Sequence, residues 1–471
     1  TVPAVSGATS YSWSYSGTGA TITGTGNSVS VDYSNTATSG TMSVAAINGC
    51  GAGTARTIAV TISPMAIATF SYTGTPYCQN SSNPSPAYSG GGSAGTFSST
   101  AGLVFVSSVT GQVNLAASTP GTYTVTNTKA AAGVCGMVTA TSTITITALG
   151  NWLGATSSDW FNPNNWVCTT VPTSSTDVII PASASIMPVI NSTGAVCRNI
   201  TINTGASLTI SGSNNLDVYG NWTNNNSFTC YNSTITFNGT GTIGGSAATA
   251  FNNVTIAASG TITAPSGAMN IAGNFTNNGT FTPAFGTIVL NGSTTQTIGG
   301  NVSSTFNNLT INNGNATGVT ISRPVAVNGT LTLTQGRVNT TATNIVTLSA
   351  TASTTIGNAT SYINGPLAYN MANNGTTILN LPLGKGSDWR PVVVTPTHNT
   401  ATSYTYTAEL FNASAQALGW TIPSSITNVS KVHYVDINRT VTATTANASS
   451  TDLTSATIQL YYSATNGSSD V

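Results

Sequence analysis

The sequence predicts an all-β protein with two N-terminal sandwiches, a central parallel β-helix and a C-terminal sandwich. Strong helix formers are rare, since the only glutamate among 471 residues is Glu409. Alternating β-branched stretches such as Thr143–Thr147 and Ser207–Ile210 recur between Asn-Gly and Gly-Gly turns. In the middle of the chain, one strand pattern returns at a fixed interval. These three observations predict strands throughout and several domains, because 471 residues exceed what one core normally organises.

Residues 1–64 and 65–147 are each expected to form an immunoglobulin-like sandwich. Both segments show short strands at roughly ten-residue spacing, turn clusters and a strand that carries Tyr or Trp. A Gly-rich stretch, 90–95, precedes no helix pattern and is therefore interpreted as a turn, not as a nucleotide-binding loop.

The six cysteines are expected to form disulfides and not a zinc site, because none is in a Cys-x-x-Cys arrangement and only two histidines are present. Cys78 and Cys135 would tie the second sandwich together, and Cys168 with Cys197 would close a loop at the start of the helix. Cys50 and Cys230 have no evident partner. Disulfides indicate an oxidising or extracellular setting.

A tryptophan cluster precedes the repeats and consists of Trp152, Trp160 and Trp166. A solenoid needs a cap, because an open end exposes apolar side chains and unpaired backbone groups. Large aromatic residues at this place are therefore interpreted as the cap of the first coil. The alternative is a platform on which sugar rings stack.

Residues 148–355 contain the internal repeat that predicts a parallel β-helix. An asparagine followed by a short strand occurs in Arg198–Ile202, Asn252–Ile256 and Asn307–Ile311, at intervals of about 54 residues. A second motif follows each copy, in Leu216–Trp222, Met269–Phe275 and Val325–Leu331. A unit of this length is expected to hold two or three coils. A string of small sandwiches is the competing architecture.

The helix also explains why charge is scarce, at 4% of the chain with Asp217 the only carboxylate from Val178 to Ser387. Equivalent side chains on successive coils lie ~4.8 Å apart, so a charged column would repel itself while Thr, Ser and Asn columns hydrogen-bond. Low charge is therefore a consequence of the expected fold.

Residues 356–471 are expected to form a C-terminal sandwich that holds most of the charge. The stretch Gly384–Pro391 predicts a tight turn with an ion pair inside the turn, and the charges here are interpreted as structural. The charged residues of this segment are Lys385, Asp388, Arg390, Glu409, Lys431, Asp436, Arg439, Asp452 and Asp470.

The composition predicts a protein that is not an enzyme, with no catalytic residue, cofactor or metal. Acid/base chemistry and glycoside hydrolysis need clustered carboxylates or bases, which the middle of the chain lacks. A net charge of zero gives no footprint for nucleic acid. No apolar run approaches the ~18 residues of a membrane-spanning helix, so membrane insertion is not expected.

The N-terminal segment resembles the PKD-like modules of very large Bacteroidota surface proteins, through Val2–Trp13, Val29–Asp32 and Ala46–Gly51. The second segment is similar to their Ig-like modules, through Phe70–Cys78 and Leu115–Val125. The motifs that resemble the Trp-rich start of their β-helices are Trp160, Asn165-Trp166, Pro172 and Asp177–Pro181.

This resemblance implies an extracellular or cell-surface protein, exported through the outer membrane by the type IX route, that acts in adhesion, gliding or a fibre. The missing partner of Cys50 and the ends of the chain suggest a piece of a longer protein, with the first and last sandwiches truncated.

Three functions from different classes follow. The first is a stiff stalk or a fibre-forming subunit whose partner is a second copy of itself. The second is an adhesive module that binds surface polysaccharide through Trp, Thr and Asn, or ice through regular Thr-x-Thr ladders, although such triplets are scattered in the sequence. The third, a polysaccharide-degrading β-helix enzyme, conflicts with the lack of carboxylates.

Overall fold

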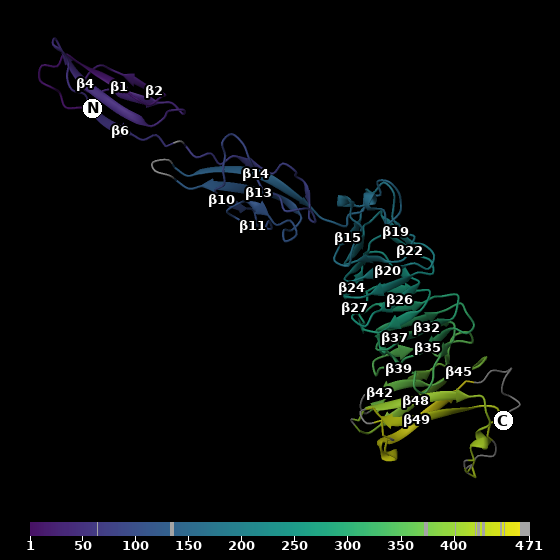
Figure 1. Cartoon of the computed structure of the whole chain (residues 1–471). Helices are drawn as coiled ribbons and strands as arrows, with labels where there is room; N and C mark the ends of the chain where they lie inside the picture. The colour runs from purple at the N-terminus through teal and green to yellow at the C-terminus, as the bar shows by residue number, and fades with distance from the viewer. Residues whose placement is uncertain are drawn as a thin grey trace. The chain divides into compact units, whose positions relative to one another are not determined.

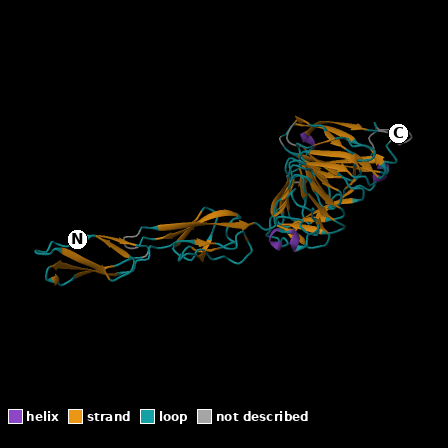
Figure 2. Cartoon of the chain, turned by 90° about the horizontal axis from the view of Figure 1, so that it is seen from above, coloured by secondary structure: helices purple, strands orange, loops and turns teal. Residues whose placement is uncertain are grey.

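The protein is built from strands in both of its compact units, Thr1–Ala148 and a second unit that begins at Leu149 (Figures 1 and 2). Strands make up 47% of the described residues, which confirms the all-β prediction. The described part of the chain adds four short 3-10 helices: η1 (Pro163–Asn165), η2 (Val167–Thr169), η3 (Ala415–Leu418) and η4 (Ser450–Asp452). The computed structural model describes residues 1–63, 65–131, 136–371, 375–400, 402–419, 421, 424–425, 429–442, 445–446 and 448–461.

The first module of unit one is an antiparallel sheet with a separate hairpin. The sheet contains β1 (Ser10–Tyr15), β4 (Gly40–Asn48), β5 (Gly51–Ala52) and β6 (Arg56–Val60). The hairpin pairs β2 (Ala20–Thr23) with β3 (Ser30–Tyr33). Met42 and Val44 on β4 are buried, and the Trp13 indole N–H donates a hydrogen bond to the Gly26 carbonyl at 3.0 Å.

The second module has a larger core, formed by alternating inward residues of its strands. Phe70, Phe97, Val125 and Ile144 are among its buried side chains. Its main sheet contains β10 (Thr96–Ser99), β13 (Gly121–Lys129), β14 (Val138–Thr147) and β8 (Tyr77–Cys78). Two smaller pairs are β7 (Phe70–Ser71) with β9 (Ala87–Tyr88), and β11 (Phe105–Ser107) with β12 (Gln112–Val113).

The second unit is a three-faced parallel β-solenoid of about ten turns, stacked as Figure 1 shows. Each coil contributes one strand to each face, so that Val178, Ile200 and Trp222 lie in register on successive coils. The first face comprises β17 (Ala195–Cys197), β20 (Asn215–Val218), β23 (Thr234–Phe237), β26 (Asn253–Ile256), β29 (Phe275–Asn277), β32 (Gln296–Gly300), β35 (Val319–Ile321), β38 (Val338–Asn339), β41 (Ile363–Asn364) and β45 (Leu383–Lys385), with β46 (Asp388–Trp389) added antiparallel.

The other two faces are each built from successive sheets. The second face comprises β15 (Val178–Ile180), β18 (Ile200–Ile202), β21 (Trp222–Asn224), β24 (Thr240–Gly244), β27 (Thr261–Thr263), β30 (Thr280–Thr282), β33 (Ser304–Phe306), β36 (Val325–Val327), β39 (Val346–Leu348) and β42 (Leu367–Met371). The third comprises β16 (Val189–Ile190), β19 (Ser207–Ile210), β22 (Ser227–Cys230), β25 (Thr249–Phe251), β28 (Ala268–Ile271), β31 (Thr287–Leu290), β34 (Asn308–Asn312), β37 (Thr330–Gln335) and β40 (Ser353–Thr354).

Antiparallel strands complete the C-terminal end of the solenoid. β42 pairs with β48 (Tyr404–Phe411), which pairs with β49 (Tyr434–Val441). β47 (Val392–His398) pairs with β43 (Gly375–Thr376), β44 (Leu379–Leu381) and β50 (Leu453–Leu460). One core continues from Trp152 to Leu410, so the boundary expected after residue 355 falls inside continuous packing.

Successive copies of the long sequence repeat do not lie on the same face of the solenoid. Its first motif lies on β18, β26 and β34, and each copy is therefore eight strands after the last. With three strands per coil, eight strands make two coils and two further strands. The motif consequently moves from the second face to the first and then to the third.

Candidate functional site

The three tryptophans of the entry segment form a buried cap on the first coil. Their exposed fractions are 0%, 0% and 1% for Trp152, Trp160 and Trp166. The Trp166 ring contacts both others edge to face, with centroids 4.8 Å from Trp152 and 4.7 Å from Trp160. The indole N–H of Trp166 donates to the Trp160 carbonyl at 2.7 Å. These rings are inaccessible to a sugar, which excludes them as a stacking platform and supports the cap interpretation.

Asn165 holds the loop of this cap, a role that the sequence did not assign to it although Asn165-Trp166 was among the motifs of the resemblance. Its buried Oδ1 accepts hydrogen bonds from the Thr156 amide at 3.0 Å, the Thr156 hydroxyl at 2.7 Å and the Ser157 amide at 2.9 Å. Its Nδ2 donates to the Ser157 hydroxyl and to the Asp159 carbonyl, each at 2.9 Å. A buried amide with all its groups paired fixes one loop conformation. The sequence feature that could have indicated this role is the position of Asn165 directly before Trp166.

An ion pair joins the first two coils. Arg198, just before β18, binds the carboxylate of Asp177, just before β15, and its Nε donates to Oδ1 at 2.7 Å. Asn199 Nδ2 donates to the same oxygen at 2.7 Å. The hydrogen bonds from Arg198 lower the pKa of the Asp177 carboxyl. The Asp177 carboxyl therefore stays ionised, and its ion pair with Arg198 joins the first coil to the second.

The two repeated sequence motifs contact each other between neighbouring coils, and we call each such contact a clamp. The asparagine of the first motif accepts a hydrogen bond from a backbone N–H of the next coil, next to the glycine of the second motif. A Cβ on that glycine would lie within 2.5 Å of the asparagine Oδ1 in all three copies, so a larger residue there would displace the asparagine from its hydrogen bond. The acceptor, donor and glycine of each clamp are Asn199, Asn221 and Gly220 (2.7 Å); Asn253, Asn274 and Gly273 (2.9 Å); Asn308, Thr330 and Gly329 (2.9 Å).

A second clamp uses the repeated Ile-Gly-Gly motif. Trp222 stacks in register on Ile243, and Phe275 on Ile298. The last glycine of each motif, Gly245 or Gly300, has a left-handed backbone with φ of +119° or +113°. A Cβ there would lie 1.9 or 2.1 Å from a carbonyl oxygen of the preceding coil. Both repeated motifs therefore serve the stacking of coils.

The structure corrects one expected disulfide. Cys168 is disulfide-bonded, but Cys197 is a free thiol, so the expected Cys168–Cys197 bridge is wrong. Cys197 points into the core from β17 and has no exposed surface, as alternation in a solenoid strand requires. Cys78 is also disulfide-bonded, and Cys135, its expected partner, lies outside the described residues. Cys50 and Cys230 are free thiols.

The free thiols are expected to react with iodoacetamide in a fixed order, which peptide mass spectrometry would measure. Cys50 is exposed and should label in the folded protein, whereas Cys197 should label only after unfolding. Burial raises the pKa of Cys230 to about 11. Because the thiolate is the reactive form, its labelling should be slow at pH 8 and accelerate as the pH rises toward 11. Labelling of Cys197 as fast as Cys50 in the folded state would contradict the buried position.

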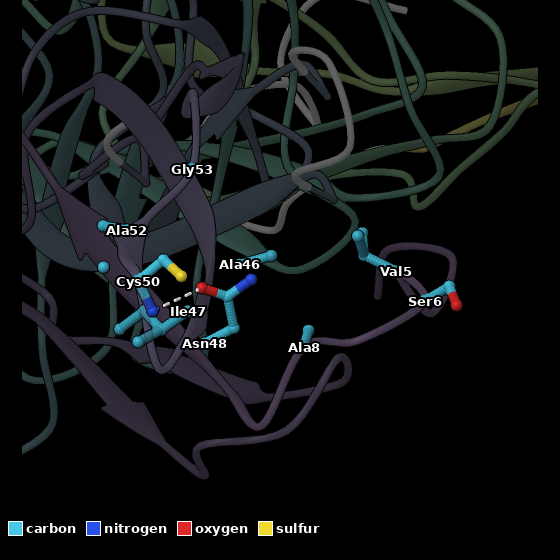
Figure 3. A pocket seen from close by; sticks show the side chains of 10 residues that line it. Val5, Ser6, Ala8, Ala46, Ile47, Asn48, Cys50, Ala52 and Gly53 are labelled. Atoms are coloured by element: carbon cyan, nitrogen blue, oxygen red, sulfur yellow. Dashed lines mark hydrogen bonds between the residues drawn. The ribbon is translucent and has the colours of Figure 1, made fainter.

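A hollow of about 310 Å³ lies beside Cys50 in the first module (Figure 3). Its lining includes Val5, Ala46, Ile47 and Asn48, and the Cys50 amide donates to Asn48 Oδ1 at 2.9 Å. Its lining side chains include neither a charged group nor a histidine. We assign no chemistry to this hollow.

The charges near the C-terminal end are joined by structural contacts. Lys385 Nζ binds Glu409 Oε1 at 2.8 Å, so the ion pair connects β45 to β48. His398 is buried, and its Nε2 lies 2.6 Å from the Tyr406 hydroxyl. Burial, and then the nearby Arg439, lower the pKa of His398, which favours the neutral imidazole. In the described part of the chain, which excludes Asp470, no three His, Cys, Asp or Glu side chains gather to hold a metal ion.

Comparison with known families matches two parts of the chain. A family model described as a PKD-like domain matches residues 1–60, which confirms the PKD-like N-terminal module. A model described as a domain of unknown function (DUF8693) matches residues 151–238, from the tryptophan cap to just past the end of β23. No curated protein and no solved structure matches the chain.

These features together indicate a broad class of protein. Among the described residues, no helix has both the length and the apolar character required to cross a bilayer. The PKD-like domain and the disulfide-bonded cysteines suggest an extracellular protein. A PKD-like domain and a β-solenoid are compatible with a structural or adhesive extracellular protein.

Proposed function

We propose that this chain is a non-enzymatic structural protein of the bacterial cell surface, in which the solenoid is a stiff stalk or the body of a fibre subunit. The observation that carries the proposal is the single core that continues from Trp152 in the cap to Leu410 on β48. A continuous core with no linker resists bending between coils, and the coil-to-coil clamps add to this resistance.

Length and charge support the same role. About ten turns at ~4.8 Å per coil give the solenoid an axial extent of ~5 nm. No charged residue occurs between Asp217 and Arg323, so this stretch offers no carboxylate, lysine or arginine for acid or base catalysis. Export through the outer membrane, by the type IX route of the Bacteroidota proteins it resembles, would place the stalk outside the cell.

Electron microscopy of the native extracellular material, with an antibody to the solenoid, tests this proposal. Filaments with an axial repeat of one subunit would support a fibre whose partner is a second copy of the chain. Isolated rods attached to cells would support a stalk. Antibody labelling found only inside the cell would contradict both the fibre and the stalk. Hydrogen exchange of the purified chain adds a second measurement, in which slow exchange throughout the solenoid coils is expected.

A further inference from the structure

Three consecutive coils of the second face carry the same four-residue motif, Gly-Thr-x-Thr. The copies are Gly239–Thr242, Gly260–Thr263 and Gly279–Thr282, on β24, β27 and β30. Strand pairing places Thr240, Thr261 and Thr280 in one column, and Thr242, Thr263 and Thr282 in the next. Triplets that look scattered in the sequence are therefore in register in the structure. We call these six residues the threonine array.

The array faces away from the core. Thr240, Thr242, Thr261, Thr280 and Thr282 are exposed, and Thr263 is partly exposed. The residues between them point inward, and Ile262 and Phe281 are buried. Within the described residues, only the Thr242 hydroxyl has a protein partner, Asn221 Oδ1 at 3.2 Å. The other five hydroxyls are free to bind water.

Glycine at the start of each motif keeps the coils close. A Cβ at Gly239 would lie 1.9 Å from the Tyr219 carbonyl oxygen of the coil before it, and one at Gly279 would lie 2.2 Å from that of Ala257. These contacts hold neighbouring strands at the normal separation of a parallel sheet. The threonine array is therefore regular both along each strand and from one strand to the next.

Its two spacings suit a crystalline ligand. Threonines lie ~4.8 Å apart between strands and ~6.6 Å apart along a strand, from two residues at ~3.3 Å each. The first distance is near one repeat distance of an ice surface, and the second is somewhat shorter than the other repeat. Threonine also has few χ1 rotamers, so its methyl and hydroxyl groups are largely ordered before binding. The absence of charge from 218 to 322 leaves the water around the array free of strong competing fields.

We propose that the threonine array is an ice-binding face, whose ligand is ordered water in the crystal lattice of ice. The Phe281 ring between the columns is buried, so the array presents hydroxyl and methyl groups and no exposed ring on which a sugar could stack. This proposal does not depend on the stalk or fibre role, because the array would act in either.

The test is incorporation of the purified chain into slowly growing ice, with Thr261→Tyr as the array variant. Thr261 lies on the middle strand and has an array neighbour on each side. Thr229→Tyr is the matched control, because Thr229 is an exposed threonine of β22 on the third face. Circular dichroism and thermal unfolding would establish that both variants fold.

We expect the parent chain and Thr229→Tyr to enter the ice, and Thr261→Tyr to be excluded like an inert protein of the same size. Exclusion of the parent chain, or equal incorporation of Thr261→Tyr, would overturn the proposal. Binding to crystalline chitin or cellulose that Thr261→Tyr abolishes, without binding to ice, would overturn it in favour of a polysaccharide surface. The antibody and filament results remain a separate test of the structural role.

Discussion

Replacement of Trp166 by alanine is expected to lower the free energy of unfolding of the solenoid by about 3–5 kcal/mol. Trp166 is 1% exposed and contacts the rings of both Trp152 and Trp160. Its loss would leave a large cavity and remove the hydrogen bond from its indole to the Trp160 carbonyl. Urea unfolding followed by far-UV circular dichroism would measure the change.

The control for this prediction is Phe285→Ala. Phe285 belongs to the same solenoid but is 88% exposed, so its removal should change the free energy of unfolding by no more than about 0.5 kcal/mol. Equal effects of the two substitutions would show that the tryptophan cluster does not cap the core.

Gly300→Ala is expected to destabilise the solenoid strongly although it adds a single methyl group. The left-handed backbone alone would cost about 1–2 kcal/mol. The added Cβ would also lie 2.1 Å from the Asn277 carbonyl oxygen, so the backbone of two coils would have to separate. We expect a loss of more than about 2 kcal/mol in the free energy of unfolding, measured by urea titration.

Gly267→Ala is the matched control, because an added Cβ there meets no atom within 4 Å. Its backbone is outside the left-handed region, and the substitution should be neutral or slightly stabilising, since alanine restricts the unfolded chain. A Gly300→Ala protein as stable as Gly267→Ala would contradict the clamp at this position.

The repeat shows how far sequence periodicity leads. The motifs at Asn199, Asn253 and Asn308 indicate a solenoid, because regular spacing of strand and turn residues implies stacked units. Their long period does not reveal the coil, which the pairing of Val178 with Ile200 shows to be less than half as long. A shorter motif carries that signal: Gly-Thr-x-Thr begins at positions 239, 260 and 279, and therefore recurs once per coil.

The cysteines and tryptophans show what the sequence did not decide, which is the burial and direction of their side chains. Trp152, Trp160 and Trp166 were consistent with either a cap or a sugar platform, and burial decided for the cap. Cys168 and Cys197 have a spacing that suits a disulfide, yet alternation along β17 turns Cys197 into the core as a free thiol. Sequence specifies residue type and spacing, but not the direction in which a side chain points.

The sequence by itself determined the all-β class, the solenoid, the scarcity of charge and the PKD-like start, because periodicity, composition and family motifs are properties of the chain. Only the tertiary structure decided the three-strand coil, the meeting of Asn253 with Gly273, and the alignment of the threonine array. The physical reason is that these contacts join residues on different coils, far apart along the chain, and their register depends on how every intervening corner folds.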